Sequence, residues 1–540
     1  MVEASEAYGR LSPFELRHEL IRRASTHRGG ADLNAGRGNP NWLAATPREA
    51  LFTLGQFAVA EATSRCGYPD MGFHARGEGI HERFLEWVAD NPAAPGLSFL
   101  RDAVAWGVAE LGFDPDAWLL ELVQAVLGDF YPAPDRMLPH VEAVVHAYLL
   151  RHVARDLRGG GRFDLFATEG GTAAMRYCFD SLMENRLLRH GDTIAIATPT
   201  FTPYLEIPSL DEFGLRIVEI AADEDDDWQY PDAEIDKLRD PAIRAFFVVN
   251  PGNPTSRAIR PRTLERIAAL VRDERPDLII VTDDVYATFV GDFRSIASVA
   301  PANTILVYSF SKHFGCTGWR LAVLAIHQDN VMDRLIAALP EADRAALHER
   351  YRRISLDPDG LKLIDRMVAD SRSVALNHTA GLSLPQQAQM ALFALFFLLD
   401  DGIAYINATR AMLFSRLCDL SQTLGLAVHY DPANSDFYAT IDLLDLARAR
   451  HGRRFAAYLQ EHHDPLDLIL ALAERQSVVV LPGRGFDGPA WSIRISLANL
   501  ADTDYVELGS RVSALLDEIY ATALPAPRRR QATTASGDDR

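Results

Sequence analysis

The chain has 540 residues, of which 48% are hydrophobic and 24% are charged, so it can bury a large core. Its formal net charge of −20 argues against a nucleic-acid partner, because a phosphate backbone requires clustered Lys and Arg. The four cysteines form no CxxC pair and no ligand spacing with His, which argues against a disulfide framework and against a metal site.

The sequence predicts a cytoplasmic protein with no membrane partner. The N-terminus has no basic segment followed by an apolar run, so no signal peptide is expected. The longest apolar stretch, from Met390 to Leu399, is about half as long as a membrane span.

In chain order, residues 1–45 are predicted to form an arm with one short amphipathic helix over Phe14–Arg23. Residues 46–130 carry apolar side chains at three- and four-residue spacing, and we expect an inserted helical region that packs with the small domain.

Over residues 131–328, helical segments alternate with short apolar runs that end in polar or Gly/Pro-rich turns. These runs are Thr193–Ala197, Ala245–Val249, Leu278–Thr282 and Thr304–Ser309. The alternation predicts an α/β domain, with a mostly parallel sheet and helices on both of its faces. Ligands of such sheets bind beyond the carboxyl ends of the strands.

The remaining chain is predicted in three parts. Residues 329–375 form a helical insertion, and residues 376–524 form a smaller α+β domain. The tail, 525–540, is rich in Pro, Arg and Ser and is predicted to be disordered. In the smaller domain we expect a helix and two strands, over Gln386–Leu399, Ser477–Leu481 and Ser492–Ser496.

Lys312 follows an apolar run, within the string SFSKHFGCTGWR. A lysine in such a Ser- and Gly-rich turn lies in a cleft, and it can form a Schiff base if its pKa is lowered. Arg320 comes eight residues later, after two glycines, and could bind a phosphate with paired donors. The alternative is a lysine and an arginine at the edge of a loop.

The string TEGGTAA, which includes Gly171 and Thr172, follows the apolar run Leu165–Ala167 and opens a helix. Glycines at a helix N-terminus leave N–H groups and a positive dipole end free for a phosphate. An ordinary N-cap turn would explain the string equally well.

Three further motifs follow apolar runs. Asp283, at the end of one run, could pair with a protonated pyridine nitrogen, and Tyr286 could bond a phenolic ring oxygen. Asn253, within NPGNPT, could donate to the same oxygen, and Phe201, within PTFTPY, could stack on a planar ring. The alternatives are an Asp N-cap, a structural turn and a core aromatic residue.

Arg494 lies within the apolar string WSIRIS. An arginine in a buried strand is costly unless it is paired, and no partner in the chain is evident from the sequence. A substrate carboxylate is the functional interpretation, and a buried structural ion pair is the alternative.

In this order, over residues 160–500, the motifs resemble fold-type I pyridoxal-phosphate enzymes of the aspartate aminotransferase superfamily. The resemblance implies a seven-stranded, mostly parallel sheet, a smaller α+β domain and pyridoxal 5'-phosphate as cofactor. It implies that Lys312 binds the cofactor covalently and moves the Cα proton, that Asp283 holds the ring nitrogen, and that Arg494 binds the substrate α-carboxylate. The other implied cofactor contacts are Gly171, Thr172, Ser309 and Arg320 at the phosphate, Asn253 and Tyr286 at the ring oxygen, and Phe201 on the ring face.

Four more strings, PFELRHEL, LNAGRGNPNWL, FYPAPDRMLPHVE and VVLPGRGF, resemble the bacterial aspartate 4-decarboxylases. That resemblance implies β-decarboxylation of L-aspartate to L-alanine and CO₂, with aspartate:2-oxoglutarate aminotransferase activity as a side reaction. It implies a homo-oligomer built from dimers, up to a dodecamer. A plain class I aminotransferase, acting on aspartate or another amino acid, is the alternative.

In the same group, Tyr131 would reach the phosphate in the neighbouring subunit. The implied neighbours of the substrate are Gly36, Arg37, Arg484 and Arg17. Arg17 stands where some members have Lys, and these two side chains are not interchangeable.

Overall fold

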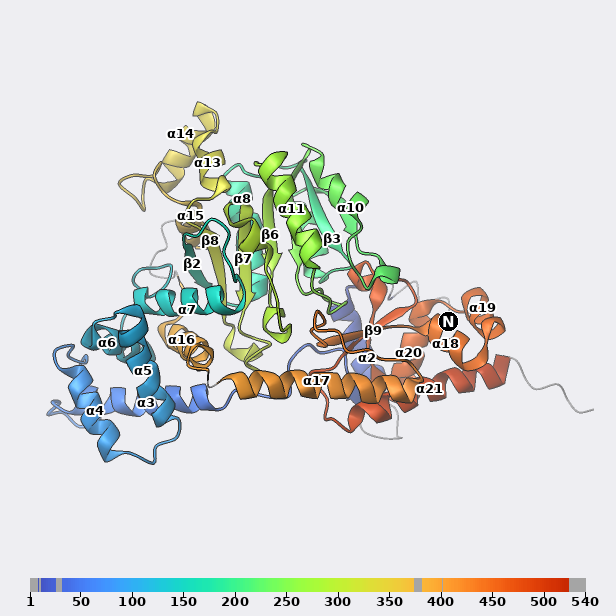
Figure 1. The fold of residues 1–540 in the computed structure, drawn as a ribbon, viewed down its shortest axis with the longest axis horizontal. Helices are drawn as coiled ribbons and strands as arrows, with labels where there is room; N and C mark the ends of the chain where they lie inside the picture. Colours follow the sequence, from blue (N-terminus) through green and yellow to red (C-terminus); the bar gives the residue numbers. More distant parts are fainter. Residues whose placement is uncertain (1–7, 9–10, 26–31, 373–380, 401, 524–540) are drawn as a thin grey trace, which may run out of the picture.

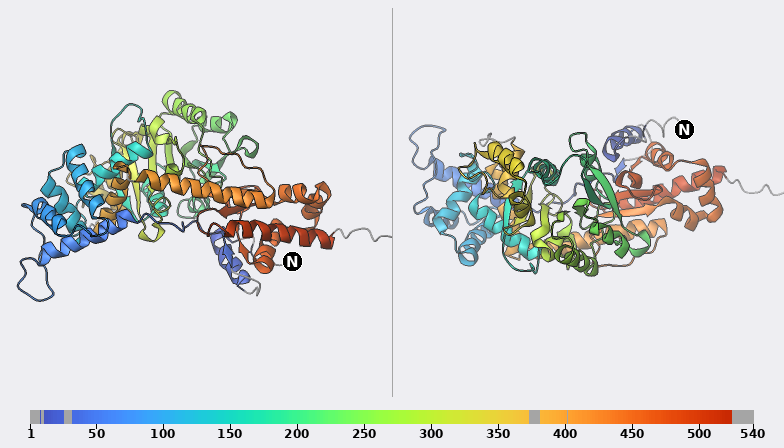
Figure 2. Two further views of the ribbon diagram at one scale, coloured as in Figure 1. Left: turned by 60° about the horizontal axis from the view of Figure 1, so that its bottom comes forward. Right: turned by 90° about the horizontal axis from the view of Figure 1, so that it is seen from above.

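The computed structural model describes residues 8, 11–25, 32–372, 381–400 and 402–523. Figure 1 shows three parts side by side: a helical lobe, a central sheet covered by helices, and a smaller domain at the opposite end. The long helix α17 (Gly402–Leu424) runs along one side and joins the central part to the smaller domain. In the smaller domain it lies beside the C-terminal helix α21 (Asp504–Ala523), as Figure 2 also shows.

The central sheet has seven strands in the order β2-β8-β7-β6-β5-β3-β4. All neighbours pair in parallel except β8, which is antiparallel to both β2 and β7. The strands are β2 (Phe163–Thr168), β3 (Thr193–Thr198), β4 (Arg216–Ala221), β5 (Ile243–Val249), β6 (Ile279–Asp283), β7 (Thr304–Ser309) and β8 (Ala322–His327). The predicted α/β class and mostly parallel sheet are confirmed, and the four apolar runs form β3, β5, β6 and β7.

Helices cover both faces of this sheet, which explains why the inner strands β5, β6 and β7 are almost continuously buried apolar runs. In β5, Phe247 and Val249 face the cluster that includes α8, α13, α14 and α15, whereas Phe246 and Val248 face α11 and α12. The helices of this part are α7 (Pro139–His152), α8 (Gly171–Glu184), α9 (Pro203–Ser209), α10 (Asp232–Asp236), α11 (Pro261–Asp273), α12 (Ile296–Val299), α13 (Val331–Ala337), α14 (Glu341–Tyr351) and α15 (Leu363–Ser371).

The predicted helical region, residues 46–130, forms four helices: α3 (Thr46–Thr63), α4 (Ile80–Asp90), α5 (Leu97–Leu111) and α6 (Pro115–Leu127). Their ends follow from local sequence. For α6, Asp114 accepts from the Ala117 N–H, Pro115 occupies the first turn, and Gly128 ends the helix at a φ of 66°.

These four helices pack with one part of the predicted small domain, residues 376–524. Within residues 376–524, they contact α16 (Leu384–Leu398), which lies against α7 and the large sheet. Among the described residues, the core of the small domain contains no side chain from 46–130. The reason is that α16 is apolar on every side, so it needs neighbours all round. The exact domain boundaries stay predictions.

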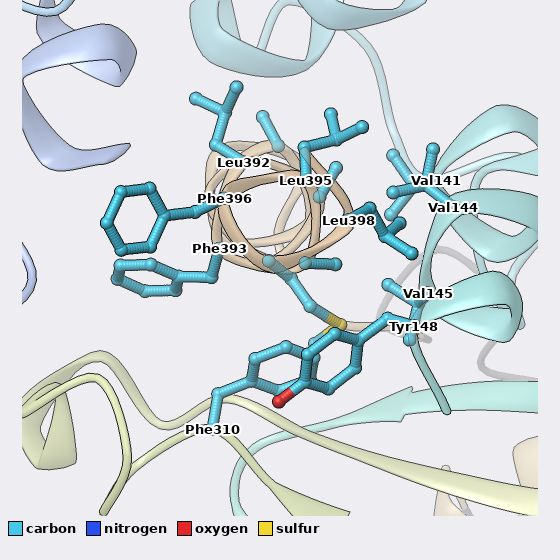
Figure 3. Close-up of a cluster of buried hydrophobic side chains, with 14 of the residues drawn as sticks. Val141, Val144, Val145, Tyr148, Phe310, Leu392, Phe393, Leu395, Phe396 and Leu398 are labelled. Carbon is cyan, nitrogen blue, oxygen red and sulfur yellow. The ribbon is translucent and has the colours of Figure 1, made fainter. Parts of the chain in front are cut away.

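Figure 3 looks along α16 and shows how it supports the turn after β7. Tyr148 and the valines of α7 flank the helix, and Phe310 lies below it, two residues before Lys312. The buried amide of Gln387 accepts from the Leu138 N–H at 2.8 Å and donates to the Leu382 carbonyl at 2.7 Å. Gln389 Nε2 likewise donates to the Pro47 carbonyl at 3.1 Å, whereas Gln389 Oε1 is buried without a partner among the described residues.

The smaller domain contains a three-stranded sheet, β11-β12-β9, and a two-stranded sheet, β1-β10. Its elements are β9 (Tyr438–Asp442), α18 (Leu443–His451), α19 (Arg453–His462), α20 (Pro465–Gln476), β10 (Val478–Val479), β11 (Leu481–Pro482) and β12 (Ser492–Ser496). The predicted strand Ser477–Leu481 is therefore two short strands in different sheets. They are separate because β10 pairs with the arm strand β1 (Leu33–Asn34).

The arm packs onto the smaller domain. Its helix α2 (Pro13–Ala24) contacts α20, and its residues Leu16, Leu20 and Leu33 lie in the core of that domain. No single helix in the described ranges is long and apolar enough to cross a membrane, and α16 and α17, the one consecutive pair that passes together, are bent by 88°.

Candidate active site

The candidate site is a cavity of about 200 Å³ at the carboxyl ends of the parallel strands. It brings together ten of the predicted residues from separate segments of the chain. They are Gly171, Thr172, Phe201, Asn253, Asp283, Tyr286, Ser309, Lys312, Arg320 and Arg494. Five further polar or small residues line the cavity and were not predicted from the sequence: Gly38, Tyr204, Ser311, Thr317 and Tyr438.

Lys312 enters the cavity from the turn after β7, and its Nζ donates to the Gly38 carbonyl at 2.9 Å. Burial lowers the pKa of Lys312, since a charged ammonium is poorly solvated there. The charges of Arg494 and Arg320 lower it further, while Tyr438 and Asp283 oppose them. This environment favours a neutral amine, the form that can act as a nucleophile or a base.

Asp283 ends β6, is buried, and forms no salt bridge among the described residues, although the charge of Lys312 acts on it. Its Oδ2 accepts from the Tyr204 hydroxyl, and its Oδ1 accepts from the Val285 N–H at 3.1 Å. Burial raises the pKa of Asp283 to about 6, against the opposing effect of these two hydrogen bonds. The carboxylate is thus oriented and ready for a cationic partner in the cavity.

The N-terminus of α8 and Arg320 form one corner of the cavity. Gly170 has a φ of 99°, and a Cβ there would lie 2.2 Å from Arg320 Nη2. Arg320 donates to the Thr317 carbonyl at 3.0 Å and, among the described residues, has no carboxylate partner. A guanidinium without a counter-ion beside free helix N–H groups suits a phosphate.

Gly170→Ala is expected to destabilise the fold by about 1–3 kcal/mol, because the methyl group must occupy a backbone region that is nearly restricted to glycine. It would also displace the Arg320 guanidinium from the corner. Urea unfolding measures the first effect, with Gly171→Ala as the control, since a Cβ there meets only an ordinary 3.6 Å contact with Ser309. Equal stability of the two variants would contradict this explanation of the corner.

Arg494, in β12, is buried and binds no carboxylate within the described part of the chain. Its Nη1 donates to Asn253 Oδ1 at 3.0 Å and its Nη2 to the Gly36 carbonyl at 3.1 Å, but its Nε has no partner. The guanidinium carbon lies 4.3 Å from the centre of the Tyr438 ring. Because an unpaired buried guanidinium is costly, a carboxylate from outside the chain is the partner that fits.

The other substrate neighbours implied by the resemblance lie outside the cavity lining. Arg17 has a buried Nε without a partner, and burial together with the charges of Arg37 and Arg494 lowers its pKa. The three arginines therefore lie near one another at the arm. Arg484 instead faces Asp464 at 3.9 Å, and Tyr131 is 75% exposed.

These residues fit pyridoxal phosphate. Arg320, which has no carboxylate partner among the described residues, lies beside Gly170 at the N-terminus of α8. The buried Asp283 forms no salt bridge among those residues, and Lys312, with its lowered pKa, lies in the same cavity. Each matches one functional group of the cofactor: phosphate, ring nitrogen and aldehyde. The individual roles of the site residues stay predictions.

Comparison with known proteins points in the same direction. Residues 166–512 match the family model for aminotransferase class I and II. The chain is 47% identical over 512 residues to the bifunctional aspartate aminotransferase and L-aspartate beta-decarboxylase of a Pseudomonas species, a match that covers 94% of this chain and 96% of that protein. It is 26% identical to an aspartate aminotransferase of Pyrococcus abyssi, over 42% of this chain and 57% of that protein.

Among solved structures, the fold is similar to an aromatic aminotransferase from Pyrococcus horikoshii, with a TM-score of 0.57 and 19% identity over 92% of this chain and 99% of that chain. An N-succinyldiaminopimelate aminotransferase from Mycobacterium tuberculosis has the same TM-score and identity, over 95% of this chain and 98% of that one. At these identities the structures establish the fold alone.

Proposed function

The chain belongs to the aminotransferase class I and II family, and we propose that it uses pyridoxal phosphate to convert L-aspartate to L-alanine and CO₂, with aspartate aminotransferase activity as a side reaction. One observation carries this choice of reaction. Similarity to the bifunctional Pseudomonas protein covers 94% of the chain, whereas the general family model matches residues 166–512. The similarity thus extends over segments that the general family model leaves out.

When bound, pyridoxal phosphate supplies an electron sink for the electron pair released at the amino acid. Lys312 binds it and then, as a neutral amine, removes the proton from Cα of the substrate. Asp283 accepts a hydrogen bond from the ring nitrogen and keeps that nitrogen protonated. Tyr204 fixes the orientation of this carboxylate through its hydroxyl. Arg320 and the N-terminus of α8 hold the phosphate.

Two sets of arginines fit the two carboxylates of aspartate. Arg494 binds the α-carboxylate, which replaces the missing partner of its guanidinium. Arg17 lies close enough to Arg37 and Arg494 for their charges to lower its pKa, and Arg17 and Arg37 are therefore assigned to the second carboxylate. Tight binding of that carboxylate stabilises the substrate and slows CO₂ loss, so the strength of this contact sets the ratio of the two reactions.

The proposed enzyme is a cytoplasmic homo-oligomer built from dimers. Tyr131, which is exposed in the single chain, would then contact the phosphate in the neighbouring subunit. Assemblies up to a dodecamer are part of this proposal.

The test is to incubate the purified protein and pyridoxal phosphate with L-aspartate, without any 2-oxo acid. Equimolar CO₂ and L-alanine are expected, measured by gas analysis and by NMR. Aspartate that is consumed only after 2-oxoglutarate is added, with no alanine formed, would instead identify a plain aminotransferase.

A further inference from the structure

We infer that Tyr438 is the acid that protonates the substrate Cβ after CO₂ has left. The inference rests on the proposed function, since a plain aminotransferase needs no proton at Cβ. Tyr438 begins β9 in the smaller domain, is 4% exposed, and lines the cavity opposite the strand ends of the large sheet.

The Tyr438 hydroxyl and the Lys312 amine both border the open space beside Gly38. A Cβ built on Gly38 would lie 2.6 Å from the Tyr438 hydroxyl and 3.0 Å from Lys312 Nζ. The hydroxyl and the amine are therefore within 5.6 Å of each other, across a glycine that leaves the space between them open. At its other side, the Tyr438 ring lies against the Arg494 guanidinium, 4.3 Å from its centre.

We assign the space beside the Tyr438 hydroxyl to the substrate Cβ. If Arg494 holds the α-carboxylate and Lys312 reaches Cα, then Cβ lies beside the line that joins these groups. The second carboxylate extends toward Arg17 and Arg37. The Tyr438 hydroxyl borders the space beside Gly38 that Lys312 Nζ also borders, and we therefore assign it to the Cβ side of the substrate.

The other acids of the cavity are already engaged. Tyr204 gives its hydroxyl proton to the hydrogen bond with Asp283. Tyr286 faces the predicted position of the ring oxygen, and Lys312 serves Cα. Among the described residues, the Tyr438 hydroxyl has one hydrogen-bond partner, the Tyr286 hydroxyl at 3.0 Å, and it can donate a proton and take one back.

The bond between Cβ and the carboxylate carbon breaks, and CO₂ leaves without the bonding electron pair. That pair stays on the Cβ side, where the electron sink supplied by pyridoxal phosphate would hold it, until it forms a C–H bond with the phenol proton of Tyr438. The resulting phenolate then takes a proton from solvent. One proton is consumed for each CO₂ released.

The experiment compares two rates in Tyr438→Phe loaded with pyridoxal phosphate: exchange of the aspartate Cα hydrogen in D₂O, and formation of L-alanine. We expect alanine formation to fall about 100-fold, the lower range for loss of an acid catalyst, while Cα exchange changes less than about threefold. Succinate binding, measured by calorimetry without cofactor, should remain unchanged because Arg494 keeps its contacts.

Two control variants separate catalysis from packing. Tyr286→Phe removes the same hydrogen bond but leaves the Tyr438 hydroxyl, so the ratio of alanine formation to Cα exchange should stay near that of the unmodified protein. Tyr430→Phe alters an exposed tyrosine and should change nothing. Equal losses of both rates in Tyr438→Phe, or no loss of either, would overturn the inference. An unmodified protein that exchanges Cα but forms no alanine would refute the proposed function as well.

Discussion

Lys312→Ala is expected to lower the turnover of L-aspartate by about 10⁴-fold or more. The variant loses both the covalent attachment of the cofactor and the base at Cα, and general acid–base catalysis alone contributes about 10²–10⁴-fold. The rest of the site should keep its structure, because the Lys312 side chain makes one hydrogen bond within the described part of the chain, to the Gly38 carbonyl. Turnover is measured as aspartate consumed, and folding by circular dichroism.

The sequence offers close controls, because it contains only three lysines, Lys237, Lys312 and Lys362. Lys237 and Lys362 are partly exposed and pair with Glu234 and Asp164 on the surface. Alanine at either position should leave turnover within about twofold, since surface ion pairs contribute little. A Lys312→Ala protein that keeps a tenth of the activity would contradict the assignment.

Arg494→Ala should lower kcat/KM for aspartate about 10³-fold. Removing one partner of a buried ion pair costs about 3–5 kcal/mol, and about 1.4 kcal/mol corresponds to a factor of ten. Arg494→Lys should recover part of the loss, because it keeps the charge but not the paired donors that match a carboxylate. The measurement is initial rate against aspartate concentration, with most of the effect on KM.

Arg448→Ala provides the matched control, since Arg448 lies on the surface of the same domain and pairs with Asp445. Its kinetic constants should equal those of the unmodified protein. If Arg494→Ala raised KM less than tenfold, the carboxylate of the substrate would bind elsewhere.

The central part of the fold could be predicted because its signals are local. Four apolar runs with polar turns after them form four neighbouring strands of the sheet, each buried on both faces. The division of the predicted strand Ser477–Leu481 into β10 and β11 could not be predicted, because it depends on which strand pairs with β10. That partner, β1, lies more than 400 residues away in the sequence.

The site residues that follow these strands could also be predicted, because a turn after a parallel strand ends at the same edge of the sheet. Tyr438 could not, since it lies on a strand of another domain and enters the cavity only after the two domains pack. Gly38 could not be predicted either, because a side chain at this position would fill the space that Tyr438 and Lys312 border only in the folded structure. Tyr204 was predictable as a site residue, because it lies three residues after Phe201 in the same PTFTPY string.

The packing of the helical lobe shows another limit. Periodicity identified the helices of residues 46–130, but it does not say which apolar surface they cover. Their contact with α16 follows from the apolar surface on all sides of that helix, which demands neighbours on each side. Burial of α16 in turn places Phe310, and with it the turn that carries Lys312.

The most direct test of the central claim is to reduce the protein with borohydride in the presence of pyridoxal phosphate, digest it and analyse the peptides by mass spectrometry. Only three lysines can carry the cofactor. We predict one modified peptide, with the phosphopyridoxyl group on Lys312 and none on Lys237 or Lys362. Modification spread over the three lysines, or absent from Lys312, would contradict the claim that this cavity is the cofactor site.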